Sequence, residues 1–234
     1  MKKTIFISLL YLAAHPAFAD DGRIELASLD RDIHRQRERV VLVPAVREKH
    51  ELYEMTGCGD MELLVAPVVR EKHELYEVTG CGEIELRDQM TRQGTAWSDG
   101  KKYDSVTSWH VTWDYEHYRS LQSCSTEAFQ ATAEITIRYP QWVRTDDAPQ
   151  ELADKWDGYL ASLIEHEKGH SDMVVKAVED LTRAVALLPA APTCAELDLL
   201  VRSLCHKRMA KLNDEAKEYD VATLHGAEQG AVFP

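Results

Sequence analysis

Residues 150–188, QELADKWDGYLASLIEHEKGHSDMVVKAVEDLTRAVALL, decide the fold of this chain. The apolar side chains of this stretch recur at helical spacing and fall within about 140° of arc when they are placed on a helix. We therefore expect one long amphipathic helix that buries a single stripe. Asp146 or Asp147 is expected to cap it, with Pro149 in its first turn, and the helix is expected to stop at Pro189.

The same helix carries the pentad His166-Glu167-Lys168-Gly169-His170, an H-E-x-x-H motif. Histidines four residues apart stand one turn apart on the same face of a helix, so both imidazoles can reach one metal ion. The glutamate lies about 100° round the helix, where it suits a general base acting on a metal-activated water. Both histidines also fall inside the apolar stripe, where burial without partners would cost several kcal/mol. The pattern therefore predicts a bound zinc ion and not two ordinary core histidines.

A catalytic zinc site needs a third protein ligand and one position left open for water. The extended metzincin motif is absent, because Met173 and Lys176 stand where its glycine and its third histidine would be. The C-terminal sequence YDVATLHG, residues 219–226, offers two better candidates. His225, which precedes a glycine that permits a close turn, is the preferred third ligand. Asp220 is the alternative, either as a ligand or as the group that orients a ligand imidazole.

A second helix is expected to begin at a capping box formed by Thr193 and Glu196. Glu196 is a further candidate for the third metal ligand, although its place in the cap accounts for it. Cys194 and Cys205 lie on this helix, roughly 16 Å apart at 1.5 Å per residue. Because a disulfide requires Cα atoms within about 7 Å, these two cysteines should not pair with each other. We expect bridges from the helix to Cys124 and to Cys81 or Cys58 instead.

Residues 44–63 recur almost unchanged as residues 67–86, with four differences in twenty positions. A solenoid requires at least three such units, so two copies indicate a local tandem duplication. The duplication explains why the number of cysteines is odd, since each copy carries one. Either one of Cys58 and Cys81 is free, or the two copies pair with each other.

Strand patterns dominate residues 38–143. Apolar and polar residues alternate across 107–115 and again across 131–139, as in half-buried antiparallel strands. Shorter strand candidates lie at 38–43 and in both copies of the repeat, and residues 83–91 could form a short helix. Strands followed by helices predict an α+β fold, with an N-terminal antiparallel sheet followed by two long packed helices.

The first nineteen residues have the features of a secretory signal peptide. Lys2 and Lys3 precede an apolar stretch at 5–14, and Ala17-Phe18-Ala19 forms a cleavage site. No later run of about 20 apolar residues exists, so we expect an exported protein that does not span a membrane, periplasmic or secreted. The expected organisation is a signal peptide at 1–19, an N-terminal extension at 20–43, a duplicated segment at 44–66 and an α+β domain at 67–234.

The formal net charge of −13 disfavours nucleic acid and anionic membrane surfaces as partners. A protein or peptide substrate remains compatible with it. The sequence contains no signal for a particular oligomeric state.

Several stretches resemble a bacterial family of predicted secreted zinc-dependent proteases. The resemblance covers roughly residues 69–234 and rests on five segments: YEVTG at 76–80, TSWHVTW at 107–113, LIEHEKGH at 163–170, YDVATLHG at 219–226 and QGAVFP at 229–234. It implies a metalloprotease. The additional copy at 44–63 departs from the family pattern.

The leading expectation is an exported zinc metallopeptidase. His166, His170 and His225 would hold Zn²⁺, Glu167 would act as general base, and Tyr219 could donate to the developing oxyanion. One alternative is a zinc-dependent hydrolase of peptidoglycan peptides. Another is a non-catalytic envelope binding or scaffold protein whose metal is closed off by four protein ligands.

Overall fold

The computed structural model describes residues 66–97, 100–146 and 148–233, together with the backbone of three short strands, β1 (Lys3–Ile5), β2 (Leu52–Thr56) and β3 (Asp60–Leu64). Apart from β1, the expected signal peptide lies outside the described residues. So do the extension at 20–43, with its strand candidate, and Cys58.

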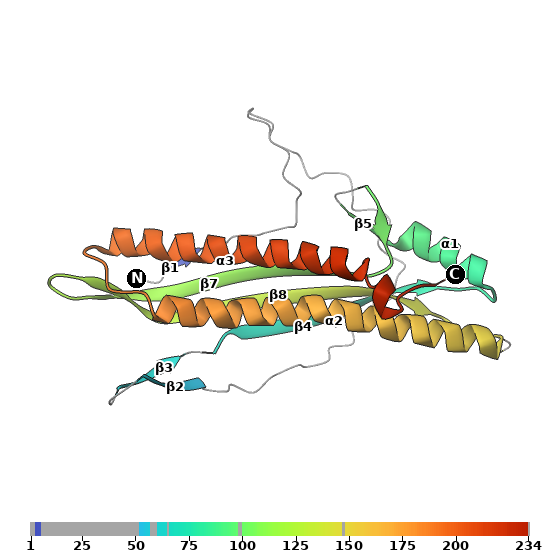
Figure 1. Ribbon diagram of the computed structural model, residues 1–234, viewed down its shortest axis with the longest axis horizontal. Helices are drawn as coiled ribbons and strands as arrows, with labels where there is room; N and C mark the ends of the chain where they lie inside the picture. Colours follow the sequence, from blue (N-terminus) through green and yellow to red (C-terminus); the bar gives the residue numbers. More distant parts are fainter. Residues whose placement is uncertain are drawn as a thin grey trace, which may run out of the picture.

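One layer of the molecule is a four-stranded sheet with the strand order β1-β7-β8-β4 (Figure 1). Its two long strands, β7 (Val106–Arg119) and β8 (Cys124–Trp142), form an antiparallel pair. On its other side β8 pairs in parallel with β4 (Val68–Val78). The predicted α+β fold is confirmed, but the prediction of an entirely antiparallel sheet is wrong at this pairing. After β4 the chain passes through a helix to β7, which does not neighbour β4. The next strand, β8, then lies between β7 and β4.

Short elements connect β4 to β7. The helix α1 (Glu83–Gln93) agrees with the short helix expected near 83–91. β5 (Thr95–Ala96) and β6 (Lys102–Tyr103) follow it and pair with each other as a separate two-stranded piece. The edge strand β1 pairs with β7 opposite Trp113–Tyr115.

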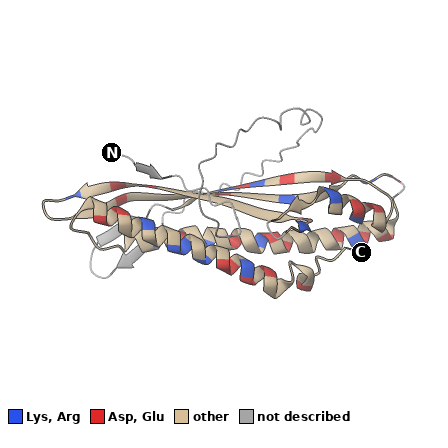
Figure 2. Cartoon of the chain, turned by 90° about the horizontal axis from the view of Figure 1, so that it is seen from above, with Lys and Arg blue, Asp and Glu red and all other residues tan. Residues whose placement is uncertain are grey.

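Two long helices, α2 (Gln150–Ala186) and α3 (Cys194–Thr223), form the second layer. They run side by side along one face of the sheet, which Figure 2 shows edge-on above them. The amphipathic stripe of α2 is confirmed, and the helix ends before Pro189. Its N-cap is Pro149, without a side-chain hydrogen bond, so the expected capping by Asp146 is wrong, and Asp147 lies outside the described residues. Proline at this position restricts the residue before it and fixes the start of the helix without a carboxylate.

The second helix begins at the expected capping box. The Thr193 hydroxyl accepts a hydrogen bond from the Glu196 amide at 3.2 Å, and a Glu196 carboxylate oxygen accepts one from the Thr193 amide at 3.2 Å. Glu196 is therefore engaged at the start of α3, at the opposite end of the helix from Asp220. Among the described residues, no helix combines the length and apolar character that a membrane span requires.

Two hydrophobic clusters fill the space between the layers. The larger cluster joins β7 and β8 to α3 and to the C-terminal half of α2, with Trp113, Ile135 and Leu181 among its fully buried side chains. The smaller one surrounds the N-terminal half of α2 and includes Trp156. Leu163 is the last α2 residue of the smaller cluster and Val174 the first of the larger. The pentad at 166–170 therefore lies on α2 between two apolar cores.

The cysteines are arranged partly as expected. Cys194 pairs with Cys124 and not with Cys205, so the start of α3 is bonded to the start of β8 across a sequence separation of 70 residues. Cys205 is buried without a disulfide partner and Cys81 is exposed without one. Cys205 lies in the core and Cys81 lies at the surface, so the expected bridge between them is absent. Burial raises the pKa of the Cys205 thiol to about 12.

The two copies of the duplicated segment have different secondary structures. The first copy contains the antiparallel hairpin β2–β3. The second copy contributes β4 to the main sheet and then the start of α1. A nearly identical local sequence therefore contributes two paired strands in one place and a strand followed by a helix in the other.

Candidate metal centre

Three polar side chains of α2 are buried where the apolar stripe passes between the two cores. His166 and Glu167 are each 3% exposed and His170 is 7% exposed. The two imidazoles stand one helical turn apart, with ring centroids 4.9 Å from each other. This is the geometry that the i, i+4 spacing of the pentad predicts.

The third donor of the cluster comes from α3. One carboxylate oxygen of Asp220, Oδ1, lies 3.3 Å from His166 Nε2 and 2.9 Å from His170 Nε2. One ligand atom from each of these residues lies within 4.8 Å of the others. Burial by itself would raise the pKa of Asp220, but hydrogen bonds with His166 and His170 outweigh it and hold this pKa well below its usual range. The group is therefore an anion facing two imidazoles.

His225, the third ligand preferred from the sequence, lies next to this cluster and outside it. Its Nδ1 is 3.6 Å from Asp220 Oδ1, and its side chain is about half exposed. The ring instead packs against Tyr103 of β6, with centroids 4.7 Å apart. The structure thus brings together His166, His170 and Asp220, the alternative third ligand, and leaves His225 beside them.

The orientation of His166 is fixed from the C-terminal segment. Its Nδ1 lies 3.0 Å from the side-chain oxygen of Gln229; with Nδ1 donating to that oxygen, Nε2 would be the nitrogen that binds a metal. The ring of Tyr219 stacks on His166 at a centroid distance of 5.0 Å and an angle of 9°. Burial lowers the pKa of His166, but its hydrogen bond with Asp220 and the nearby charge of Glu167 raise it more.

His170 faces Asp220 with Nε2, and its other ring nitrogen has no partner among the described residues. Nδ1 of His170 is buried, and no hydrogen-bond partner lies near it within the described part of the chain. An unpaired buried polar group of this kind costs about 1–3 kcal/mol. Two imidazole nitrogens and a carboxylate oxygen are a ligand set that zinc accepts in catalytic sites. The donors present therefore fit a divalent cation.

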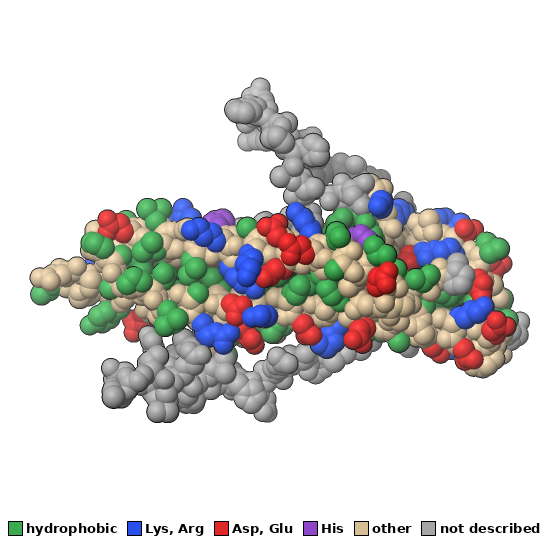
Figure 3. All heavy atoms as spheres, in the orientation of Figure 1, with side chains coloured by type: hydrophobic (Ala, Val, Ile, Leu, Met, Phe, Trp, Pro, Cys, Tyr) green, Lys and Arg blue, Asp and Glu red, His purple; other side chains and the backbone are tan. Residues whose placement is uncertain are grey.

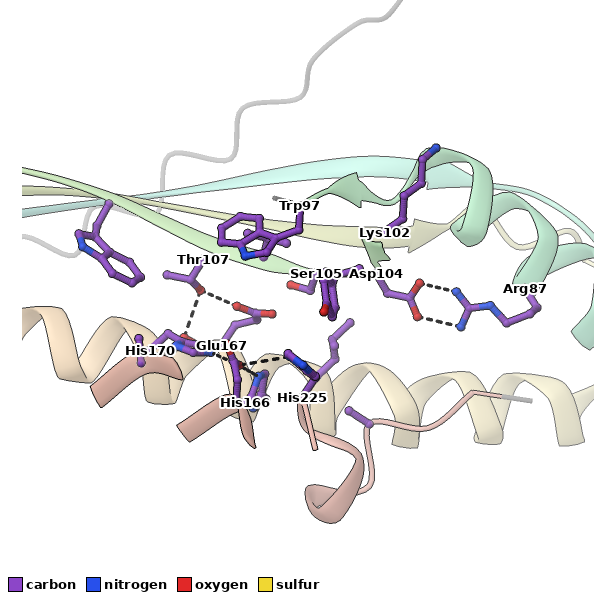
Figure 4. A pocket seen from close by; sticks show the side chains of 17 residues that line it. Arg87, Trp97, Lys102, Asp104, Ser105, Thr107, His166, Glu167, His170 and His225 are labelled. Carbon is purple, nitrogen blue, oxygen red and sulfur yellow. Dashed lines mark hydrogen bonds and ion pairs between the residues drawn. The ribbon is translucent and has the colours of Figure 1, made fainter. Parts of the chain in front are cut away.

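Glu167 is oriented by the opposite layer. Thr107, a buried residue of β7, donates a hydrogen bond from its hydroxyl to Glu167 Oε2 at 2.6 Å (Figure 4). Glu167 is not part of the group of mutually close donors. Its carboxylate is therefore held next to the cluster without belonging to it, as a general base requires.

A pocket of about 350 Å³ opens in front of these groups. Its walls are β7 and the segment around β6 on one side, and α2, α3 and the chain after α3 on the other (Figure 4). The residues that line it are Arg87, Trp97, Lys102, Tyr103, Asp104, Ser105, Val106, Thr107, Trp109, Leu163, His166, Glu167, His170, Ala216, Asp220, His225 and Ala231.

A second polar cluster closes the end of the pocket away from the histidines. The Asp104 carboxylate accepts two hydrogen bonds from Arg87 of α1, and one from the Tyr159 hydroxyl of α2 at 2.6 Å. The Tyr76 hydroxyl of β4 donates to the Asp104 carbonyl oxygen at 2.8 Å. Asp104 therefore ties three elements to the chain that leads into β7, and so helps to fix Thr107.

A second group of close donors lies far from the pocket. It consists of His117, Cys124 and Cys194. The two cysteines form the disulfide, and His117 Nε2 lies 2.7 Å from Asp198 Oδ1. Its donors are thus already bonded to each other or to a carboxylate.

A family model described as "Bacterial protein of unknown function (DUF922)" matches residues 73–226, about two thirds of the chain. The chain belongs to this family. The match includes the pentad, Thr107, Asp220 and His225. The description of the family names no activity, so it supports the expected bacterial family and leaves the protease function as a proposal. Searches of curated proteins and of solved structures found no significant match.

Within the DUF922 segment, two glycines shape the site, and only Gly226 had been singled out from the sequence, as a turn residue. A Cβ at Gly169 would lie 2.4 Å from the Tyr219 hydroxyl oxygen, so only glycine lets Tyr219 approach α2 this closely. A Cβ at Gly226 would lie 3.1 Å from His166 Cγ. A signal for Gly169 was present, since glycine inside a helix costs about 1 kcal/mol relative to alanine and implies a packing reason.

Charged side chains of both signs lie on the face formed by the two long helices (Figure 3). On the face formed by α2 and α3, acidic and basic side chains are interspersed with each other (Figure 3). No single-sign field covers this visible face, in spite of the net charge of −13.

Proposed function

We propose that this protein is an exported zinc-dependent metallopeptidase. The observation that carries the proposal is the convergence of His166, His170 and Asp220 on one wall of a pocket, with the buried Glu167 carboxylate beside them. Catalytic zinc sites combine three protein ligands with one open position. Export is supported by the signal peptide expected at residues 1–19.

The spacing of the donor atoms supports zinc. Ligands that share one zinc ion at bond lengths near 2.0–2.1 Å lie about 3.4 Å apart in a tetrahedral site. The separations from Asp220 Oδ1 to the two imidazole nitrogens, 2.9 and 3.3 Å, are close to this value. If Nδ1 of His166 donates to Gln229, Nε2 would be the nitrogen that binds the metal.

The chemistry of the proposed site divides between the cofactor and the chain. Zinc, when bound, would acidify a water molecule and polarise a carbonyl group. Glu167 would accept the proton of the attacking water and later deliver it to the leaving nitrogen. Thr107 would fix the orientation of the Glu167 carboxylate during this transfer, because its hydroxyl bonds Oε2 at 2.6 Å.

The pocket favours a catalytic site over a closed structural one. A non-catalytic role would be expected if a fourth protein ligand completed the coordination. His225, a further donor beside the cluster, stands outside the group of mutually close donors. The space in front of the cluster therefore supports a hydrolase.

Replacement of Glu167 by Gln provides the direct test. The variant should keep its zinc, because Glu167 is not a ligand, and should lose hydrolysis of a protein substrate such as casein by about 1000-fold. Glu165→Gln is the matched control, since Glu165 is exposed on the same helix. Zinc is measured by elemental analysis and peptide release by mass spectrometry. Full activity of Glu167→Gln would exclude the assigned base.

A separate experiment tests whether the substrate is a protein or the peptide part of peptidoglycan. Purified peptidoglycan and casein are incubated with the wild-type protein and with Glu167→Gln. Release of stem peptides from peptidoglycan without cleavage of casein would replace the protein substrate by a cell-wall substrate, with the same catalytic groups.

A further inference from the structure

The chain after α3 is held in a strained turn. Leu224, His225 and Gly226 all have positive φ, at 50°, 52° and 85°. L-residues other than glycine rarely adopt this left-handed conformation, and such residues persist only where their surroundings hold them, often at functional sites. Two consecutive non-glycine residues in this region therefore indicate that the position of His225 is specified.

The contacts of the turn show what holds it. The His225 amide donates to the Asp220 carbonyl oxygen at 2.8 Å, and the Gly226 amide donates to the Thr223 hydroxyl at 3.3 Å. Gly226 packs directly on the ring of His166. The turn that carries His225 is thus built onto the metal centre itself.

The ring of His225 is directed into the pocket (Figure 4). One side of it faces Asp220, 3.6 Å from Nδ1, and Tyr103 packs against the ring from β6. Nε2 makes no hydrogen bond to a residue in the described part of the chain. This nitrogen is therefore available to whatever occupies the pocket.

Other polar side chains of the pocket are already engaged. The Thr107 hydroxyl donates to Glu167, the Ser105 hydroxyl to the Arg138 carbonyl oxygen at 2.7 Å, and Arg87 to Asp104. Tyr219, the oxyanion donor suggested from the sequence, accepts a hydrogen bond from Gln229 Nε2 at 3.1 Å and does not line the pocket.

We propose that His225 is a catalytic residue of the proposed peptidase and not one of its zinc ligands. As the water oxygen bonds to the carbonyl carbon, the C=O π electrons move to the carbonyl oxygen and Glu167 takes the water proton. His225, in the form that carries a proton on Nε2, donates a hydrogen bond from this nitrogen to that oxygen while its charge develops. When the C–N bond breaks, the electrons return to re-form the carbonyl, and the leaving nitrogen receives the proton from Glu167.

Kinetics of His225→Ala and His225→Gln test this role, which rests on the proposed function. Both variants should keep the zinc content of the wild type. The value of kcat should fall by about 100-fold in the alanine variant with little change in KM. Glutamine, which keeps an N–H donor, should restore part of the loss. Leu224→Ala is the matched control, because Leu224 is an exposed left-handed residue of the same turn.

A binding measurement gives a readout that is independent of turnover. A phosphinic peptide, whose tetrahedral oxygens imitate the developing oxyanion, should bind His225→Ala about 100-fold more weakly than the wild type. In the Glu167→Gln background, loss of the histidine should leave the affinity for the uncleaved parent peptide unchanged.

The possible failures are distinguishable. Loss of zinc from His225→Ala would make His225 a ligand. This result would overturn the inference and would not contradict the proposed peptidase function. Unchanged kcat and unchanged phosphinic-peptide affinity would also overturn it. A wild-type protein that retains zinc and hydrolyses no peptide would overturn the proposed function, and the catalytic role of His225 with it.

Discussion

Two groups of metal-binding residue types lie in the described part of the molecule, and they differ in what their donors already contact. In the group near the ends of β7 and β8, the cysteines are bonded to each other and Asp198 accepts hydrogen bonds from both His117 and Tyr115. In the group on α2 and α3, His166 and His170 share one oxygen of Asp220 at the wall of a pocket. Residue type alone does not distinguish the two groups. The bonds and hydrogen bonds that each donor already makes do distinguish them.

The largest effect on zinc binding is expected from removal of a donor in the pocket group. His166→Ala or His170→Ala should weaken zinc binding by at least about 100-fold, because a ligand itself is lost and even its supporting contacts are worth 10–100-fold. His117→Ala should bind zinc as the wild type does. Competition with a chelator of known affinity measures all three. Equal zinc loss in all three variants would mean that the two groups do not differ.

The residues whose replacement removes zinc should differ from those whose replacement destabilises the fold. Replacement of Cys124 and Cys194 together by Ser should lower the free energy of unfolding by about 4 kcal/mol, the value expected for a loop closed over 70 residues. Zinc content should not change. Denaturant titration of the metal-free protein provides the measurement. A loss of zinc without a loss of stability would reverse the roles assigned to the two groups.

The pocket group also depends on a close approach that a single methyl group would block. Gly169→Ala would place Cβ against the Tyr219 hydroxyl, so it should cost about 2 kcal/mol through overpacking and lower the affinity for zinc. Gly158→Ala, on the same helix but with open space around it, should instead stabilise by about 1 kcal/mol. Thermal unfolding of the two variants compares them directly.

The smallest effect concerns a thiol that belongs to neither group. Cys205 is buried and its pKa is raised to about 12 by burial, whereas Cys81 is exposed. Because the thiolate is the reactive form, Cys205 should resist alkylation in the folded protein and react only after unfolding. Cys81 should react at once. Mass spectrometry of the alkylated peptides measures both, and rapid labelling of Cys205 would contradict its buried position.

Much of this arrangement could be predicted from periodicity and short motifs. The apolar stripe predicted α2, the spacing within the pentad predicted that His166 and His170 face the same way, and the capping box predicted the start of α3. These are local properties, determined within a few turns of the chain. The expected cap at Asp146 failed because the N-cap of α2 is Pro149, which makes no side-chain hydrogen bond.

Features that depend on distant segments could not be predicted in the same way. The sequence left both Asp220 and His225 as candidates, since the two lie one turn or so apart near the end of α3 and only the packing of α3 on α2 separates them. The parallel pairing of β4 with β8 is another such feature. The duplicated segment makes the point most directly, because nearly the same twenty residues form a hairpin once and a strand with a helix the other time.

The position of Asp220 near the C-terminal end of α3 has one further consequence. The Cys124–Cys194 bond anchors the opposite end of that helix. A cation held by His166, His170 and Asp220 would cross-link α3 to α2, so that α3 would be tethered at both of its ends, once covalently and once reversibly. The resistance of the whole protein to unfolding would then rise with the concentration of free metal in its surroundings.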